Sequence, residues 1–329
     1  MLKILRLIFL ILHTGIFILL SGMLMNAYVS PKIFPWLNLL SLGFPLLIIA
    51  YILLTIFWIL SWKKRAFVFF FAGLLFFNPV LRWINFSQPK NEKADLKIVT
   101  FNVKNGVLGK ENIENFINSQ DADVVLFQEM VNKKYDFKGL KQSSKTLLTS
   151  VFTKHKVIAE KNLLDGEYEN GNATQTDIEI NGKTYRIINV YLQPFRFDKS
   201  MVKLNGDSEE DEQKLKDIVR KLIPTFKIHQ EQIVPIRESI ESSPYPVILA
   251  GDFNAVPNSY EYYELSKDLE DAFMKAGSGS ATSFHDYKFP IRIDYIFTSK
   301  SVKALSYKVD RSAKLSDHYP VVATFKLNN

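Results

Sequence analysis

The chain has 329 residues and no cysteine. Disulfide bonds and thiolate zinc sites are therefore excluded, and the absence fits a protein on either side of a membrane. Acidic residues are scarce in the first 93 positions, which hold nine Lys and Arg but a single acid, Glu92. The net charge of this part is therefore 9 − 1 = +8. Residues 94–329 hold the other 32 basic and 33 acidic residues, so 32 − 33 = −1. The net charge of +7 thus belongs to the N-terminal third and does not indicate a nucleic-acid-binding surface.

Charged side chains are missing from long stretches of this N-terminal third. Residues 7–30 and 37–62 contain none, and residues 66–86 contain only Arg82, which must reach outward to the membrane surface. A helix of about 20 apolar residues spans the roughly 30 Å core of a bilayer. All four Trp lie at or near the ends of these runs, where an interfacial aromatic belt places them. We expect residues 1–86 to be a membrane anchor of three transmembrane helices, about 7–29, 37–62 and 66–86. A cleaved signal peptide is disfavoured because two further apolar runs follow the first.

The basic residues of the anchor predict its orientation. Lys3 and Arg6 precede the first run, the sequence Lys-Lys-Arg at 63–65 joins the second to the third, and the intervening loop has only Lys32. The positive-inside rule places the N-terminus and residues 63–65 in the cytoplasm. Three spans then predict a multi-pass protein of the cell membrane whose remaining chain is extracytoplasmic. If the third run does not cross, the sidedness is inverted.

Residues 87–95 are polar and are expected to link the anchor to a second domain, 96–329. Alternating apolar residues predict strands at 96–103 and 302–309, and Asn181-Gly182 between two alternating runs predicts a hairpin. Residues 208–242 are charged with apolar residues at helical spacing, and Pro224 and Pro235 interrupt them. This pattern predicts one or two surface helices.

The stretch PVILAGDFNAVPNS, residues 246–259, carries the first chemical signal. Residues 247–250 are apolar and predict a short buried strand, which ends just before Asp252 and Asn254. A buried carboxylate needs a metal, a cation or a reacting group beside it. Asp and Asn also satisfy turn amides, so this stretch alone leaves both interpretations open.

Other strands end in the same way. An apolar run precedes each of a set of acid, amide or imidazole side chains: Asn102, Glu129, Asp252 with Asn254, Asp294, and Asp317 with His318. Each of them alone has an ordinary structural explanation, such as a solvated strand end. Together they indicate a site at one edge of a sheet, where carboxylate and amide oxygens would suit Mg²⁺ or Mn²⁺ and an imidazole titrates near neutrality.

Six motifs in order, TFNVKNG, LFQEM, NVYLQ, AGDFNAVPNS, RIDYIF and LSDHYPV, resemble those of the endonuclease/exonuclease/phosphatase (DNase I-like) superfamily. The resemblance covers residues 96–327. It implies an α+β fold, a four-layer α/β/β/α sandwich of two mixed sheets, and Mg²⁺-dependent hydrolysis of phosphate esters.

The resemblance also assigns the metal side of the site. Glu129 would be the main metal ligand, Asn102 would lie beside the ion and orient it or the phosphate, and Asp317 would lie at the metal side. The nuclease branch that acts at abasic sites has an acid two residues after its Asn, where this chain has Lys104. A second metal ion is therefore in doubt.

The same resemblance also implies which residues are catalytic. Asp252 would position and activate the attacking water, and Asn254 would hydrogen-bond the phosphate. His318, held by Asp294, would contact the scissile phosphate. Whether Asp252 or His318 takes the proton of the water is left open. Tyr191 stands where many members have His, and it either donates to the phosphate or is a strand aromatic. Arg196, Lys199 and His285 are candidate substrate contacts, although a solvated surface position is the favoured interpretation for each.

The sequence therefore predicts a membrane-anchored, Mg²⁺-dependent phosphoesterase that uses metal-assisted in-line attack of water. A phosphodiester is the favoured substrate. Its expected partners are the lipid bilayer and a phosphate ester, which is a phospholipid headgroup, a nucleic acid or a small molecule. No protein partner is inferred. One alternative is a DNA endonuclease or exonuclease of the same family. A second is a non-catalytic, membrane-tethered binding module, which the intact set of site residues disfavours.

Overall fold

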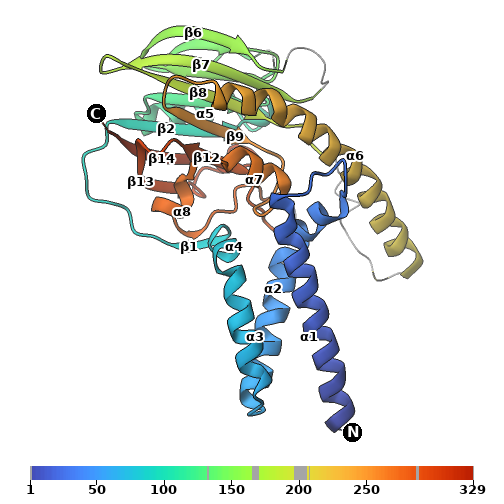
Figure 1. Ribbon diagram of the computed structural model, residues 1–329. Helices are drawn as coiled ribbons and strands as arrows, with labels where there is room; N and C mark the ends of the chain where they lie inside the picture. Colours follow the sequence, from blue (N-terminus) through green and yellow to red (C-terminus); the bar gives the residue numbers. More distant parts are fainter. Residues whose placement is uncertain are drawn as a thin grey trace.

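Two six-stranded sheets, face to face, form the centre of the described structure, and helices cover their outer faces (Figure 1). The computed structural model describes residues 2–131, 133–164, 170–195, 206, 208–286 and 289–328. The first sheet has the order β10 (Glu270–Asp271), β12 (Asp294–Thr298), β9 (Val247–Asp252), β8 (Lys183–Tyr191), β7 (Asn172–Ile180) and β6 (Lys156–Asn162). The second has the order β13 (Val302–Val309), β14 (Val321–Leu327), β2 (Leu96–Asn102), β3 (Val124–Gln128), β5 (Thr149–Thr153) and β4 (Lys141–Lys145).

The two-residue period of each strand divides its side chains between two cores. In β2, Leu96 and Ile98 point into the core between the sheets, where Ile187 and Ile248 of the other sheet meet them. The alternate residue Val99 lies in a separate core beneath α5 (Lys110–Gln120). Successive side chains of a strand point to opposite faces, so strands that are buried on both sides read as continuous apolar runs.

The other outer face is covered by α6 (Ser208–Glu241) and α7 (Tyr260–Ser266), whose apolar residues pack on β8, β9 and β12. The layers are therefore helix, sheet, sheet, helix, and the expected α+β sandwich is confirmed. Pro224 and Pro235 lie inside one continuous helix, which buries Ile233 and Ile236. Packing of this apolar face offsets the hydrogen bonds that the two prolines remove.

Residues 84–86 differ from their expected place at the end of the third membrane span. They form strand β1 (Ile84–Phe86), which pairs antiparallel with β11 (Ser278–Ser280). Asn85 explains the difference, because its side-chain amide donates to the backbone oxygens of Phe273 and Met274 at 2.9 Å each. The N-terminal part is thus attached to the sandwich before the polar linker begins.

The N-terminal helices project from the sandwich as a bundle (Figure 1). They are α1 (Leu2–Leu24), η1 (Met25–Ala27), α2 (Trp36–Leu60), α3 (Arg65–Gly73), η2 (Leu74–Phe76) and α4 (Phe77–Leu81). Among the described residues, two helices, Lys3–Ala27 and Trp36–Leu60, are long and apolar enough to cross a membrane, and Arg65–Leu81 is a shorter apolar helical segment. The N-terminus and the α2–α3 connection lie at the end of the bundle far from the sandwich (Figure 1).

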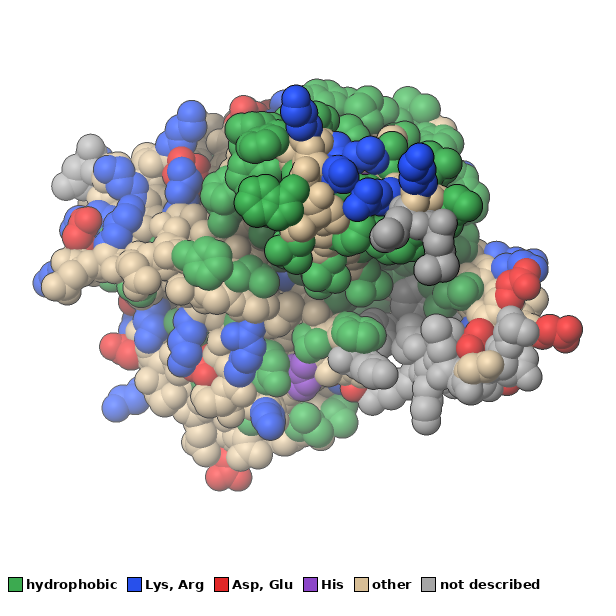
Figure 2. All heavy atoms as spheres, turned by 90° about the horizontal axis from the view of Figure 1, so that it is seen from below, with side chains coloured by type: hydrophobic (Ala, Val, Ile, Leu, Met, Phe, Trp, Pro, Cys, Tyr) green, Lys and Arg blue, Asp and Glu red, His purple; other side chains and the backbone are tan. Residues whose placement is uncertain are grey.

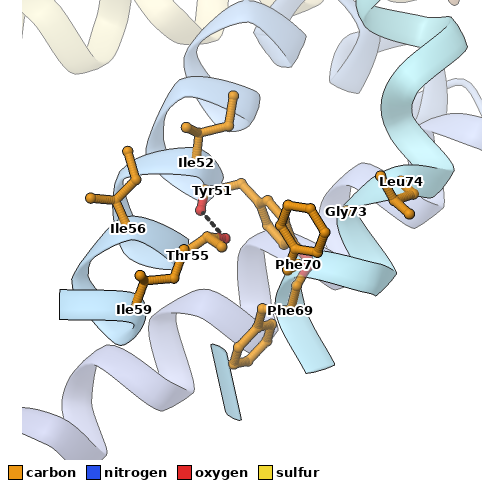
Figure 3. Close-up of a pocket in the computed structure, with 9 residues that line it drawn as sticks. All are labelled: Tyr51, Ile52, Thr55, Ile56, Ile59, Phe69, Phe70, Gly73 and Leu74. Atoms are coloured by element: carbon orange, nitrogen blue, oxygen red, sulfur yellow. Dashed lines mark hydrogen bonds between the residues drawn. The ribbon is translucent and has the colours of Figure 1, made fainter. Parts of the chain in front are cut away.

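The outside of this bundle is apolar. Seen from its far end, it is a hydrophobic surface on which basic side chains gather (Figure 2). A recess between α2 and α3 is lined mainly by Ile, Leu and Phe side chains and is therefore apolar too (Figure 3). Gly73 leaves room there beside the ring of Tyr51. Two polar contacts lie inside the bundle: Trp58 Nε1 donates to His13 Nδ1 at 3.1 Å, and Tyr51 Oη donates to the oxygen of Phe69 at 2.6 Å. Soluble proteins rarely expose so continuous an apolar surface.

Gly251, just before Asp252, has a backbone that other residues rarely adopt. Its φ is +140°, and a Cβ atom there would lie 2.0 Å from the backbone oxygen of Val190. Gly251→Ala is expected to destabilise the protein by about 3 kcal/mol or more and to lower the Tm by roughly 6–12 °C. Thermal unfolding of the full-length protein in detergent measures this shift.

Gly182 provides the matched control. Its φ is +78° in the β7–β8 turn, and nothing lies within 4 Å of the added Cβ. Gly182→Ala therefore carries only the cost of the left-handed backbone, about 1 kcal/mol, or roughly 2–4 °C. Equal shifts in the two variants would contradict the role of close packing at Gly251.

Candidate active site

Strand direction explains why the polar residues at the strand ends meet. Strands β2 and β3 are parallel, as are β8 and β9, so each pair ends at the same edge. Tyr191 is the partner of Asp252 in the register between β8 and β9. Strand β12 runs antiparallel to β9, and its first residue, Asp294, therefore pairs with the last residue of β9, Asp252. The residues after these strands, Glu129 and Asn254, continue from the same edge.

The amide of Asn102 joins the two sheets. Its Nδ2 donates to Glu129 Oε1 and to Asp252 Oδ2, both at 2.9 Å, and its Oδ1 accepts from the backbone N of Lys104 at 3.0 Å. Two carboxylates from different sheets are thus held by one buried side chain. Their remaining oxygens can face a common ligand between them.

Tyr191 contacts the carboxylate of Glu129. Its hydroxyl donates to Glu129 Oε1 at 2.9 Å. Burial, with the nearby charges of Glu129 and Asp252, raises the pKa of Tyr191 well above its usual range, so the hydroxyl remains a donor. The hydroxyl therefore holds Glu129 in place, a contact that neither interpretation from the sequence includes.

Asp252 combines the two roles that the sequence left open. Its Oδ1 accepts from the backbone N of Asn254 at 2.8 Å, which is the turn interaction. Its Oδ2 faces Asn102 and lies 3.7 Å from His318 Nε2. Asn254, at φ +45°, donates its side-chain amide to the oxygen of Leu192 at 2.8 Å. The turn therefore fixes the carboxylate rather than replacing its role in the site.

The imidazole of His318 lies between two buried carboxylates. Its Nδ1 donates to Asp294 Oδ2 at 2.8 Å. Burial alone would lower the pKa of His318, but the charges of Asp294 and Asp252 raise it to about 10. Burial raises the pKa of Asp252 to about 7, against the opposing effect of His318. The arrangement therefore favours an imidazolium at neutral pH.

Asp317 pairs with the residue that departs from the nuclease motif. Lys104 Nζ lies 2.5 Å from Asp317 Oδ2 and 3.8 Å from Asp286 Oδ2. Lys104 and the following Asn105 have φ of +43° and +53°, and a left-handed pair of non-glycine residues is uncommon. Although burial acts in the opposite direction, His318 and Lys104 lower the pKa of Asp317. Sequence reasoning treated Lys104 only as a missing acid and missed this contact.

The other expected substrate contacts are less informative. His285 stacks on Tyr319 with ring centroids 4.0 Å apart, and its backbone N donates to the oxygen of Asp317 at 3.0 Å. Its ring thus borders the site from the loop before β12. Arg196 and Lys199 lie outside the described residues.

The donor set fits a hard divalent cation. The carboxylates of Glu129 and Asp252 offer oxygens, which Mg²⁺ prefers, and Glu129 Oε2 accepts no hydrogen bond from a described residue. Asp252, Asp294 and His318 also bring ligand atoms within 4.8 Å of one another. In that group the imidazole of His318 lies within 4 Å of both carboxylates and offsets part of their charge, so we favour Glu129 as the metal side.

Removing the charge of Asp294 tests this arrangement. In Asp294→Asn the buried imidazolium loses the carboxylate bonded to Nδ1, so the pKa of His318 is expected to fall from about 10 toward its ordinary value of 6.5. Histidine ¹⁵N NMR titration in EDTA measures it, with His318→Gln for assignment. Asp121→Asn, which changes an exposed carboxylate paired with Lys154, is the control. An unchanged pKa in Asp294→Asn would refute the assigned charge pairing.

Comparisons with known proteins place this geometry in a family. A model described as "Endonuclease/Exonuclease/phosphatase family" matches residues 99–318, and a model described only as a domain of unknown function matches residues 6–83. No curated protein matches the chain.

Solved structures share the fold at low identity. A family protein from Bacteroides thetaiotaomicron is 16% identical with a TM-score of 0.54, over 74% of this chain and 97% of that one. A conserved protein of unknown function from Enterococcus faecalis V583 is 18% identical with a TM-score of 0.51, over 71% of this chain and all of that one. The human Nocturnin catalytic domain with bound sulfate is 16% identical with a TM-score of 0.49, over 70% and 94%.

The family model covers more than half of the chain, including every residue assigned to the site. The chain therefore belongs to the endonuclease/exonuclease/phosphatase family, whose members are hydrolases that act on phosphoester bonds and typically use divalent metals.

Proposed function

We propose that the protein is a membrane-anchored, Mg²⁺-dependent phosphoesterase that hydrolyses a phosphodiester by in-line attack of water. The observation that carries this proposal is the amide of Asn102, which holds Glu129 and Asp252 on either side of one site. Glu129, Asn102 and Asp317 would hold the ion, which supplies a Lewis acid that neutralises charge on the phosphoryl oxygens.

Asp252 and His318 would have different roles in proton transfer and hydrogen bonding. Asp252 is held by Asn102 and by the backbone N of Asn254, so its carboxylate can orient a water molecule and accept its proton. His318 is better suited to donate a hydrogen bond to the phosphoryl group than to act as the base, because its two carboxylate neighbours raise its pKa. Asp294 fixes the orientation of the ring. Asn254 would hydrogen-bond the phosphate, and Tyr191 would orient Glu129.

Two alternatives are less well supported. A duplex-DNA nuclease gains affinity from clustered Lys and Arg, whereas residues 94–329 carry a balance of −1. In a non-catalytic module, nothing would offset the desolvation cost of burying an imidazole between two carboxylates. Metal-dependent hydrolysis is therefore the better explanation of the site.

Activity of the full-length protein toward bis-p-nitrophenyl phosphate in detergent tests the proposal. Mg²⁺ is expected to support hydrolysis and EDTA to abolish it. Asp252→Asn is expected to lower kcat about 10²–10⁴-fold, because it removes the proton acceptor. Glu129→Gln is expected to raise the Mg²⁺ concentration needed for half-maximal activity. The exposed Asp121→Asn is the control. Activity that survives EDTA, or an unchanged kcat in Asp252→Asn, would falsify the assignment.

The anchor is proposed to cross the membrane three times, with the catalytic domain outside the cytoplasm. Residues 65–81 continue the bundle as a third apolar helical segment of about 26 Å at 1.5 Å per residue, close to the thickness of a bilayer core. The N-terminal end of α1, which carries Lys3 and Arg6, and the α2–α3 connection, which carries the basic residues 63–65, lie at the end of the bundle far from the sandwich (Figure 1). The positive-inside rule assigns this end to the cytoplasm.

Reporter fusions test this topology. An alkaline phosphatase reporter, active only outside the cytoplasm, is expected to be active after Leu327 and inactive after Lys64. A cytoplasm-active fluorescent reporter at the same two positions should give the opposite pattern and serves as the control. Phosphatase activity after Lys64 but not after Leu327 would invert the proposed orientation.

A further inference from the structure

The helical bundle is joined to the catalytic domain by buried polar contacts as well as by the chain itself. Asn258, which is fully buried, accepts a hydrogen bond at its backbone oxygen from Asn26 at 3.1 Å and at its Oδ1 from Arg82 at 2.8 Å. Its own amide donates to the oxygen of Pro79 at 3.2 Å. One loop residue of the domain thus binds two separate segments of the bundle.

A buried carboxylate forms the second joint. Glu261 is fully buried, and both of its oxygens accept from Nδ2 of Asn38 on α2, at 3.1 and 2.9 Å. His229 of α6 contacts the same carboxylate at 2.9 Å, and Oδ1 of Asn38 accepts from the backbone N of Tyr260 at 2.8 Å. Separating the bundle from the domain would leave this carboxylate without its amide donor, which is costly in a buried position.

These joints belong to the loop that carries the catalytic residues. Asn258 follows Asn254 by four positions. Between them, Val256 packs in one apolar cluster with Leu20 and Phe44 of the bundle, and Ile293, the neighbour of Asp294, lies in the same cluster. Only one loop therefore separates the reacting carboxylates from the membrane helices.

Aromatic side chains indicate where the surface of the bilayer lies. Between α1 and α2, on the side of the sandwich, Tyr28 is 81% and Trp36 is 51% exposed. Such residues favour the headgroup level of a membrane. The same connection contacts α6 through Lys32, whose backbone N donates to Gln230 Oε1 at 2.9 Å and whose Nζ pairs with Glu231 at 2.7 Å. The connection at the proposed headgroup level therefore contacts α6 of the catalytic domain directly.

We propose that the docked bundle holds the active site at the bilayer surface and that the substrate is the phosphodiester of a membrane-borne amphiphile. This inference rests on the proposed phosphodiesterase function. A flexible tether would serve equally well for a soluble substrate, whereas buried joints fix both the height and the orientation of the site. The near-neutral charge of residues 94–329 also favours an amphiphile over a nucleic acid.

Two phosphodiesters with the same leaving group test the inference. Hexadecyl p-nitrophenyl phosphate enters vesicles, whereas ethyl p-nitrophenyl phosphate stays in solution. The full-length protein in phosphatidylcholine vesicles with Mg²⁺ is expected to favour the hexadecyl ester about tenfold or more in kcat/KM, because confinement to the surface raises the effective concentration. Equal rates on the two esters, or faster hydrolysis of plasmid DNA, would overturn the inference. Absence of Mg²⁺-dependent hydrolysis of the ethyl ester would instead refute the proposed function.

Variants of the joints separate membrane docking from catalysis. Asn38→Leu and, independently, Arg82→Met are expected to lower the ratio of hexadecyl to ethyl ester hydrolysis about fivefold or more, with the rate on the ethyl ester retained. The matched control is Asn91→Leu, at an exposed position of the linker, which should keep the wild-type ratio. A wild-type ratio in both joint variants would overturn the inference. An equal loss on both esters would overturn it too, since the joints would then act on the catalytic groups themselves.

Discussion

The candidate active site depends on a hydrogen-bonded amide buried between two sheets. Asn102 ends a strand of one sheet and donates to Asp252 at the end of a strand of the other. Carboxylates at such a depth repel one another and are costly to desolvate, so they require donors and a cation. Asn102 and Tyr191 supply the donors, and His318 supplies one positive charge. Glu129 Oε2, which accepts no hydrogen bond from a described residue, suits a divalent ion. The sandwich serves to hold these groups in place.

The same need for polar satisfaction explains how the N-terminal bundle meets the domain. Glu261 and Asn258 are fully buried at the junction, and each finds its partners on the helices of the bundle. A membrane helix is usually thought of as an anchor joined to an enzyme by a linker. In this protein the bundle also supplies hydrogen-bond partners to the segment that follows Asp252, so the bundle and the candidate active site share one structural unit.

Much of the fold could be predicted because its signals are local. The expected strands at 96–103 and 302–309 match β2 and β13, and the Asn181-Gly182 hairpin is confirmed with both turn residues at positive φ. The errors have local causes as well. Residues 84–86 continue the apolar run before them, but they pair with β11, and the contacts of Asn85 with Phe273 and Met274 attach this strand to the domain.

The sequence alone determined which residues end the strands, because alternation and apolar runs mark each strand and the polar residue that follows it. It therefore identified Asn102, Glu129 and Asp252 as members of one site. Only the tertiary structure decided which of these side chains contact one another. Asn102 and Asp252 lie 150 residues apart, and no local pattern encodes such a pair. The contact of Tyr191 with Glu129, the pairing of Lys104 with Asp317 and the docking of Asn38 on Glu261 are of this kind. Each gives a buried or partly buried carboxylate a donor within the protein, which offsets the loss of contact with water.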